Sequence, residues 1–200
     1  MSRIYLSSDI HFVAKDIFED IQHYKKSFKT IFITTGAETH KDHSWVDANR
    51  NGMKEAGFDL FDYTLTGKTP KDIESDLKDV DIVHVNGGNC HKIVTEAKNS
   101  GFESWIKQAL ERGVIYTGSS GGSISAAPDI SRIYRDDTEG PMGLDLVPML
   151  IIPHWGLPER HNLYLDDRLS KIFADNHFLV PLRDNQYLKI EDGLVSFRSV

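Results

Sequence analysis

The segment GVIYTGSSGG, residues 113–122, places a serine where it could act as a nucleophile. An apolar run ends there in glycines and serines, which fit the pattern G-x-S-x-G in one register only, with Ser120 at its centre. In a nucleophile elbow, a sharp turn between a strand and a helix lifts the serine hydroxyl clear of the sheet, so the flanking residues must be small. An ordinary glycine-rich turn or a phosphate-binding loop is the alternative interpretation.

A second glycine turn, Asn86-Gly87-Gly88-Asn89, follows the apolar run DIVHV. Exposed backbone N–H groups at such a turn can stabilise an oxyanion as it develops in a reaction. A tight connection between a strand and a helix, or an anion-binding nest, would have the same sequence. The turn therefore supports acyl-transfer chemistry only together with a nucleophile and a base.

A histidine and an acid also follow apolar runs. His154 ends LVPMLIIPH, and Asp184 comes shortly after HFLVPL. A histidine beside Ser120 could take the proton of its hydroxyl, and Asp184 could fix the histidine tautomer and stabilise the imidazolium that forms. Asp136 and Asp137, in the segment YRDDTEG, are alternative candidates for the acid.

Other reactive side chains fit less well. Cys90 lies in the glycine-turn segment while Ser120 occupies the elbow, so a small buried hydrophobic residue is the favoured interpretation of this cysteine. His40 and His43 have a spacing that suits a metal, but no third ligand is evident nearby. His84 is internal to an apolar run. We therefore expect no metal and no organic cofactor.

The elements that would position these residues alternate along the chain. Strands are expected at 3–8, 30–36, 58–65, 81–88, 113–120, 146–154 and 177–184. Helices are expected at 14–28, 42–57, 69–79 and 157–176, with a pair of helices around 92–113. This alternation predicts an α/β fold in three layers, with a mostly parallel sheet and helices on both faces. The alternating runs of 186–200 predict a C-terminal β-hairpin. Parallel strands all end at one edge of a sheet, where ligands bind, so the candidate residues should meet there.

Length and composition restrict the class of protein. Two hundred residues fit one domain, 1–200, and the formal net charge of −7 argues against nucleic acid or an anionic membrane as the main partner. Cys90 is the only cysteine, and neither a signal peptide nor an apolar stretch of about 20 residues is evident. We expect a cytoplasmic protein whose partner is a small or peptidic substrate.

Four segments together resemble peptidase family S51, the peptidase E group of serine peptidases. VNGGNCHKIV resembles the G-G-G-N-[ST] motif of this family, and GVIYTGSSGGSIS resembles its G-x-S-A-G elbow. IIPHWG resembles the N-P-H-[FW] segment, and LRDNQYLKIEDG resembles the acidic L-P-E-x-x-[WAY] segment. The four segments occur in the family's order between about residues 80 and 193.

The resemblance implies a fold similar to class I glutamine amidotransferases and a dipeptidase-like serine peptidase that hydrolyses short peptides through an acyl-enzyme. Ser120 would be the nucleophile, His154 the general base, and Asp184 would stand where the family often has glutamate. The backbone N–H groups of Gly88 and Gly121 would form the oxyanion hole.

The sequence also departs from the family pattern. Asn86 replaces the first glycine of its motif, and Gly121 replaces the usual alanine after the nucleophile. The arginine with which aspartyl dipeptidases hold an N-terminal aspartate aligns with Leu165, although Arg160 and Arg168 are nearby. The sequence therefore does not predict specificity for N-terminal aspartate.

Two alternative functions follow from these departures. The chain could be a hydrolase similar to the related cyanophycinases, which cut an aspartate-arginine polymer, or a family member that binds a small acidic or peptidic ligand without cleaving it. The sequence leaves open whether the protein forms a homodimer.

Overall fold

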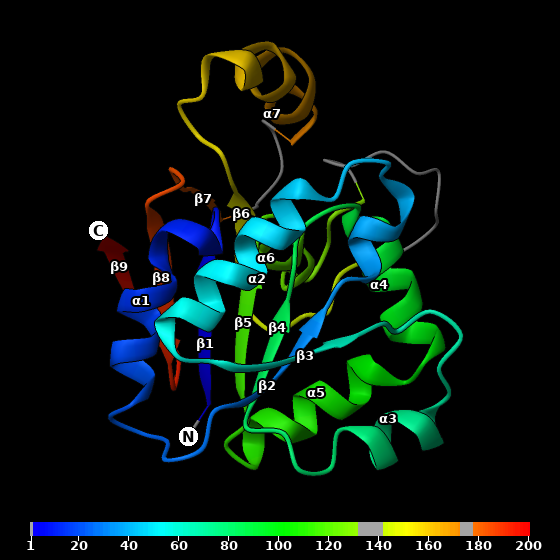
Figure 1. Ribbon diagram of the computed structural model, residues 1–200. Coiled ribbons are helices and arrows are strands. Elements are labelled where there is room, and N and C mark those ends of the chain that lie inside the picture. The colour runs from blue at the N-terminus through cyan, green and yellow to red at the C-terminus, as the bar shows by residue number, and fades with distance from the viewer. Residues whose placement is uncertain (1, 132–141, 173–177) are drawn as a thin grey trace.

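A central seven-stranded sheet forms the core of the computed structural model, which describes residues 2–131, 142–172 and 178–200 (Figure 1). The strands are β1 (Arg3–Ser7), β2 (Lys29–Ile33), β3 (Asp59–Tyr63), β4 (Ile82–Val85), β5 (Ile115–Ser119), β6 (Leu150–Ile152), β7 (Leu179–Pro181), β8 (Gln186–Glu191) and β9 (Leu194–Ser199). The helices are α1 (Ile10–Ile21), α2 (Ser44–Ala56), α3 (Pro70–Asp76), α4 (Cys90–Asn99), α5 (Phe102–Glu111), α6 (Gly121–Ser125) and α7 (Leu169–Ile172). Shorter helical turns are η1 (Thr35–Thr39), η2 (Pro158–Arg160) and the π-helical η3 (Leu163–Arg168).

The seven strands lie in the order β3-β2-β4-β5-β1-β8-β9. The first five are parallel, and β8 and β9 add an antiparallel edge beside β1. The two residues between β8 and β9, Asp192 and Gly193, have φ values of 48° and 83°. Positive φ at both positions is typical of the type I′ hairpin turn, whose twist matches that of the strands. The predicted hairpin is thus confirmed.

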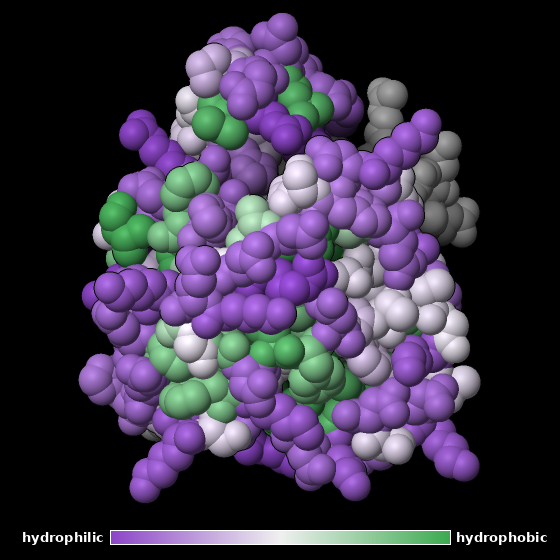
Figure 2. Space-filling model, in the orientation of Figure 1, coloured by the Kyte–Doolittle hydropathy of each residue, from purple (hydrophilic) through white to green (hydrophobic). Residues whose placement is uncertain are grey.

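Helices cover both faces of the sheet, as predicted. Side chains of neighbouring positions in a strand point to opposite faces, and β2 shows this: Ile31 and Ile33 pack into one hydrophobic cluster, and Phe32 packs into the other. The cluster around Phe32 is closed by α1 and α2, and the opposite one by α3, α4 and α5. In Figure 2 the face in view is largely hydrophilic, with smaller hydrophobic areas. The three-layer α/β prediction is confirmed.

The segments expected as the sixth and seventh strands behave differently. Only 150–152 and 179–181 are extended, and they pair in parallel with each other as a separate two-stranded sheet. The place beside β1 is taken by β8, so these short strands pack against the C-terminal end of the main sheet instead. Leu150 and Ile152 contact the cluster that contains α4 and α6 side chains.

The helix expected at 157–176 is interrupted. Its described part consists of the short turns η2 and η3 followed by α7, and residues 173–176 lie outside the described ranges. Within 2–131, 142–172 and 178–200, no helix is both long and apolar enough to cross a bilayer.

His84 is a buried titratable group at the centre of the sheet. It is fully buried in β4, stacked on Phe32, and its Nδ1 lies 2.9 Å from Oγ1 of Thr117. Burial lowers the pKa of His84 to about 3. The folded protein therefore holds a neutral imidazole where the unfolded chain would bind a proton.

Replacing His84 with phenylalanine is expected to flatten the pH dependence of stability. As the pH falls below about 6.5, only the unfolded chain protonates His84, so wild-type stability should decrease by about 2 kcal/mol between pH 6.5 and 5 from this group. His84→Phe should lack that component. Urea unfolding at pH 7, 6 and 5 measures it, with the exposed His161→Gln as control. Equal slopes in His84→Phe and wild type would contradict the expectation.

Candidate active site

Ser120 occupies a strained turn between β5 and α6. Its φ of 48° and ψ of −112° lie outside the usual regions for a residue with a side chain, and such strain is concentrated at functional sites. The turn is held by two hydrogen bonds: the Ser120 N–H donates to the Ser7 carbonyl at 3.1 Å, and the Ser120 carbonyl accepts from Ile124 N–H at 3.0 Å. The predicted strand–turn–helix context is present, with the hydroxyl half-buried at the sheet edge.

Glycine is required beside Ser120 because other backbone segments pass close to it. A Cβ atom on Gly122 would lie 1.9 Å from the Val85 carbonyl oxygen, and one on Gly118 would lie 2.9 Å from the carbonyl carbon of Gly122. Both distances are below any ordinary contact. The small residues of the elbow thus serve a packing need that the sequence pattern anticipated.

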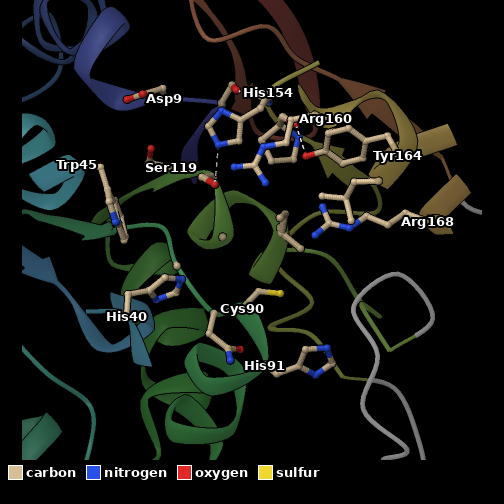
Figure 3. Close-up of a pocket in the computed structure, with 18 of the residues that line it drawn as sticks. Asp9, His40, Trp45, Cys90, His91, Ser119, His154, Arg160, Tyr164 and Arg168 are labelled. Carbon is tan, nitrogen blue, oxygen red and sulfur yellow. Dashed lines mark hydrogen bonds between the residues drawn. The ribbon is translucent and has the colours of Figure 1, made fainter. Parts of the chain in front are cut away.

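His154 and Asp184 meet Ser120 in a continuous line of contacts. The Nε2 atom of His154 lies 3.0 Å from Ser120 Oγ, and its Nδ1 lies 2.7 Å from Asp184 Oδ1. The three residues come from the ends of β5, β6 and the segment after β7, so three parts of the chain converge at one edge. Figure 3 shows the imidazole of His154 pointing into a cavity. The structure brings together all three residues predicted from the sequence.

Ser8 is part of this arrangement and was not predicted. Its fully buried hydroxyl donates to Asp184 Oδ1 at 2.7 Å and accepts a hydrogen bond from the backbone N–H of His154, also at 2.7 Å. One side chain therefore holds the acid and the histidine backbone, which has a φ of 58°. Ser8 directly follows β1, so the strand-end rule applied to the first apolar run would have found it.

The electrostatics of Asp184 fit a charged acid. Its hydrogen bond to His154 is the main cause that lowers the pKa of this carboxyl group, and the hydrogen bond from Ser8 acts in the same direction. Asp184 is therefore a carboxylate at neutral pH, although partial burial opposes this. A carboxylate in this position can stabilise an imidazolium on His154.

The two glycine turns touch each other beside Ser120. A Cβ atom on Gly121 would lie 2.4 Å from the Gly88 oxygen and 3.1 Å from its nitrogen, and Gly88 itself has a φ of 108°. The backbones of Gly88 and Gly121 are therefore in direct contact, and glycine at 121 allows it. Asn86 is fully buried and accepts a hydrogen bond from Asn49 Nδ2 at 2.8 Å, so it fits where the family motif has glycine.

The rival candidates have other environments. Cys90 is buried at the start of α4 in the cavity wall, and His43 Nε2 lies 2.9 Å from the His40 carbonyl oxygen. Among the residues that the structure describes, no three His, Cys, Asp or Glu side chains are grouped to hold a metal. Asp136 and Asp137 lie outside the described residues.

A cavity of about 770 Å³ opens at Ser120 and His154. Its walls include Asp9, Trp45, Arg160, Tyr164 and Arg168, shown in Figure 3. Its size is within the range of small-molecule sites. Leu165 lies in a smaller neighbouring pocket, whereas Arg160 and Arg168 line the main cavity.

An α/β sheet that ends in a glycine-flanked serine, in contact with a histidine, is typical of hydrolases that act by acyl transfer. The model of peptidase family S51 matches residues 6–197. The chain belongs to peptidase family S51.

Individual relatives agree with this assignment. The chain is 26% identical over 185 residues to an uncharacterized peptidase of Pasteurella multocida. The aligned residues cover 92% of this chain and 89% of that protein. It is 35% identical over 126 residues to peptidase E of Salmonella typhi, covering 58% and 55% of the two chains. In structure, the fold matches a Listeria monocytogenes protein assigned as a peptidase E, with a TM-score of 0.79, 20% identity and coverage of 100% and 99%.

Proposed function

We propose that this protein is a cytoplasmic serine peptidase that hydrolyses short peptides through a Ser120-His154-Asp184 triad. The observation that carries the proposal is the line of contacts from Asp184 Oδ1 through His154 to Ser120 Oγ, with distances of 2.7 and 3.0 Å. This line is the hydrogen-bonded arrangement that activates a serine hydroxyl. Membership of a peptidase family supports the same chemistry.

The reaction would proceed in two steps. Ser120 Oγ attacks the carbonyl carbon of the scissile peptide while His154 Nε2 takes the hydroxyl proton, and the Asp184 carboxylate stabilises the imidazolium. The backbone N–H groups of Gly88 and Gly121, at the two turns in contact, donate to the oxyanion. The C–N bond then breaks and His154 gives its proton to the leaving amine. A water molecule, deprotonated by His154, attacks the acyl carbon. The bond from that carbon to Ser120 Oγ then breaks, His154 returns the proton to Ser120 Oγ, and the acid is released.

Covalent labelling tests the nucleophile directly. A serine-directed fluorophosphonate is expected to add to Ser120 of the folded protein, because only an activated hydroxyl displaces fluoride at a useful rate. Intact mass spectrometry followed by peptide mapping measures the added mass and its position. Labelling should be lost in His154→Ala. A folded wild-type protein that does not react would favour the alternative function, ligand binding without cleavage.

A further inference from the structure

The outer side of β9 is an open strand edge at one end of the main sheet. Among the described strands, only β8 pairs with β9, and this pairing runs from Glu191–Leu194 to Gln186–Ser199 without a bulge. In Figure 1, β9 lies at the left edge of the sheet, and Figure 2 shows a hydrophobic area at this edge. An open edge presents backbone N–H and C=O groups with which a further strand can pair.

The hairpin shows which backbone groups of β9 face outward. The carbonyl of Asn185, which precedes β8, accepts the N–H of Val200 at 3.1 Å, so this N–H points toward β8. Backbone groups along a strand point alternately to its two sides, so every second residue of β9 bonds to β8. The N–H and C=O groups of the residues between them point away from β8, and these residues are Val195, Phe197 and Ser199.

Two side chains of β9 continue the hydrophobic core to this edge. Val195 pairs with Ile190 and Phe197 with Leu188, and directly opposite residues share a face of the sheet. Leu188 and Ile190 are buried in the cluster that α3, α4 and α5 close. Phe197 is nevertheless 53% exposed, so the apolar row is left uncovered at the last strand.

The two outer strands of the sheet differ in charge. Aspartates at 59 and 62 lie on β3, the opposite edge, and two copies of β3 would bring these acids together. β9 has no acidic residue, and its one charged side chain is Arg198. Charged residues are a common protection of strand edges. Four exposed apolar side chains lie on β9 and the residue after it: Leu194, Val195, Phe197 and Val200.

We propose that two copies of this chain pair through their β9 edges as an antiparallel, twofold-symmetric dimer, in which Phe197 lies opposite the partner's Phe197. The inference does not depend on the proposed peptidase function. A twofold axis perpendicular to the sheet makes the two β9 strands antiparallel and keeps corresponding faces of the two sheets on the same side. The two seven-stranded sheets then form one continuous sheet, and neither copy retains an open β9 edge.

The register centred on Phe197 satisfies the outward backbone groups and covers the apolar side chains. Val195 lies opposite the partner's Ser199, so all three outward-facing residues of each copy exchange N–H···O bonds with the other. The two Phe197 rings form a cross-strand aromatic pair on the core face. On the other face, Leu194 lies opposite the partner's Val200, and these exposed side chains cover each other.

The neighbouring registers fit less well. With the axis at Arg198, the two arginines would lie directly opposite each other, which is destabilising. With the axis at Ser196, Leu194 would lie opposite the partner's Arg198. Val200 would then lie opposite the partner's Asp192, so both apolar side chains would face charges. The pattern of β9 therefore selects one self-pairing.

Sedimentation velocity from about 1 to 200 μM, a range that detects a micromolar dissociation constant, measures the association. Wild type should change from one chain of 22.7 kDa to two as the concentration rises, because one strand pair is a small interface. Phe197→Lys places like charges opposite each other and should raise the dissociation constant by roughly 100-fold or more. Phe12→Lys is the matched control, since Phe12 is 55% exposed on α1, and it should keep the wild-type constant.

A second variant tests the backbone pairing without removing an apolar side chain. Ser199→Pro deletes one outward N–H, and proline is tolerated on the open side of an edge strand. This variant should also weaken the dimer. Thermal unfolding of Phe197→Lys and Ser199→Pro at low concentration should match that of wild type, and if Phe197→Lys failed to fold, Ser199→Pro would decide the test.

Cysteine cross-linking measures the register. In a Cys90→Ser background, Phe197→Cys should form a disulfide-linked dimer on mild oxidation. The Cα atoms of opposite, hydrogen-bonded residues are about 5.5 Å apart, which is within disulfide range. Ser196→Cys and Arg198→Cys, each at the axis of a neighbouring register, should cross-link much more slowly. Faster cross-linking at 196 or 198 than at 197 would overturn the proposed register.

Two results would overturn the dimer itself. One is a wild-type protein that remains a single chain throughout the concentration series, and the other is a dimer that persists in both Phe197→Lys and Ser199→Pro. Assemblies of more than two chains would also contradict it, since the symmetric pairing closes after two. Labelling of Ser120 by a fluorophosphonate is a separate readout, so the dimer and the peptidase proposal can fail independently.

Discussion

Ser120→Ala is expected to lower kcat/KM for short peptides by roughly 10⁴- to 10⁶-fold, as loss of a working triad member does. The substitution removes the oxygen that contacts His154 Nε2 at 3.0 Å and leaves the rest of the cavity in place. Alanine keeps the two backbone hydrogen bonds that hold the turn at Ser120, so the fold should persist. Steady-state kinetics and thermal unfolding measure the two effects separately.

The adjacent Ser119 provides the matched control. Its hydroxyl is buried and accepts a hydrogen bond from Ile10 N–H at 3.0 Å, which ties α1 to β5. Ser119→Ala should therefore reduce stability while most of the peptidase activity remains. If Ser120→Ala retained wild-type turnover, or if Ser119→Ala were the inactive variant, Ser120 would not be the nucleophile.

The elbow and its partners could be predicted because each has a local pattern. GSSGG after an apolar run requires a turn with close backbone contacts, and Gly122 shows why a larger residue fails there. His154 and Asp184 each follow a short apolar run, and the carboxyl ends of such runs gather at one edge. The order of the four family-like segments added the assignment of the three residues to one site, although β6 and β7 lie outside the main sheet.

The rest could not be predicted because it depends on pairing between distant segments. No local pattern shows that β8 takes the position beside β1 and leaves β6 and β7 as a separate sheet. The strand-end rule points to Ser8 as a candidate, but its two hydrogen-bond partners depend on tertiary structure, because β1 ends beside both His154 and Asp184. Asp9 and Arg160 likewise line one cavity only because the tertiary structure brings their segments together.

Positive φ values at residues other than glycine occur at the candidate active site. Ser120 and His154 are two of only four residues in the described ranges that combine a side chain with positive φ. A third is Asp192, in the hairpin turn where positive φ is expected. Ser120 and His154 both line the cavity, so two of these four residues belong to the candidate site.

Asp184→Asn is expected to lower kcat/KM by roughly 10²- to 10⁴-fold, because the variant removes the charge that stabilises the imidazolium of His154. Ser8 donates to the same Oδ1 atom that His154 contacts, so it should hold the amide oxygen of Asn toward the histidine. The substitution thus isolates the charge and leaves the orientation of the ring. Kinetics at pH 7 to 8 measure the loss.

Asp136→Asn and Asp137→Asn are the controls, since the sequence allowed either residue to orient His154; both variants should keep near wild-type activity.

The pH dependence of stability gives a second measurement of the Asp184 charge. The lowered pKa of Asp184 means that its charged form stabilises the folded state above the pKa of the unfolded chain, about 4, and that this contribution is lost as the pH falls through the lower folded value. The part of the stability difference between wild type and Asp184→Asn that comes from this charge should therefore decrease as the pH falls below about 4. Full activity in Asp184→Asn, with a large loss in Asp136→Asn or Asp137→Asn, would transfer the acid's role to that residue.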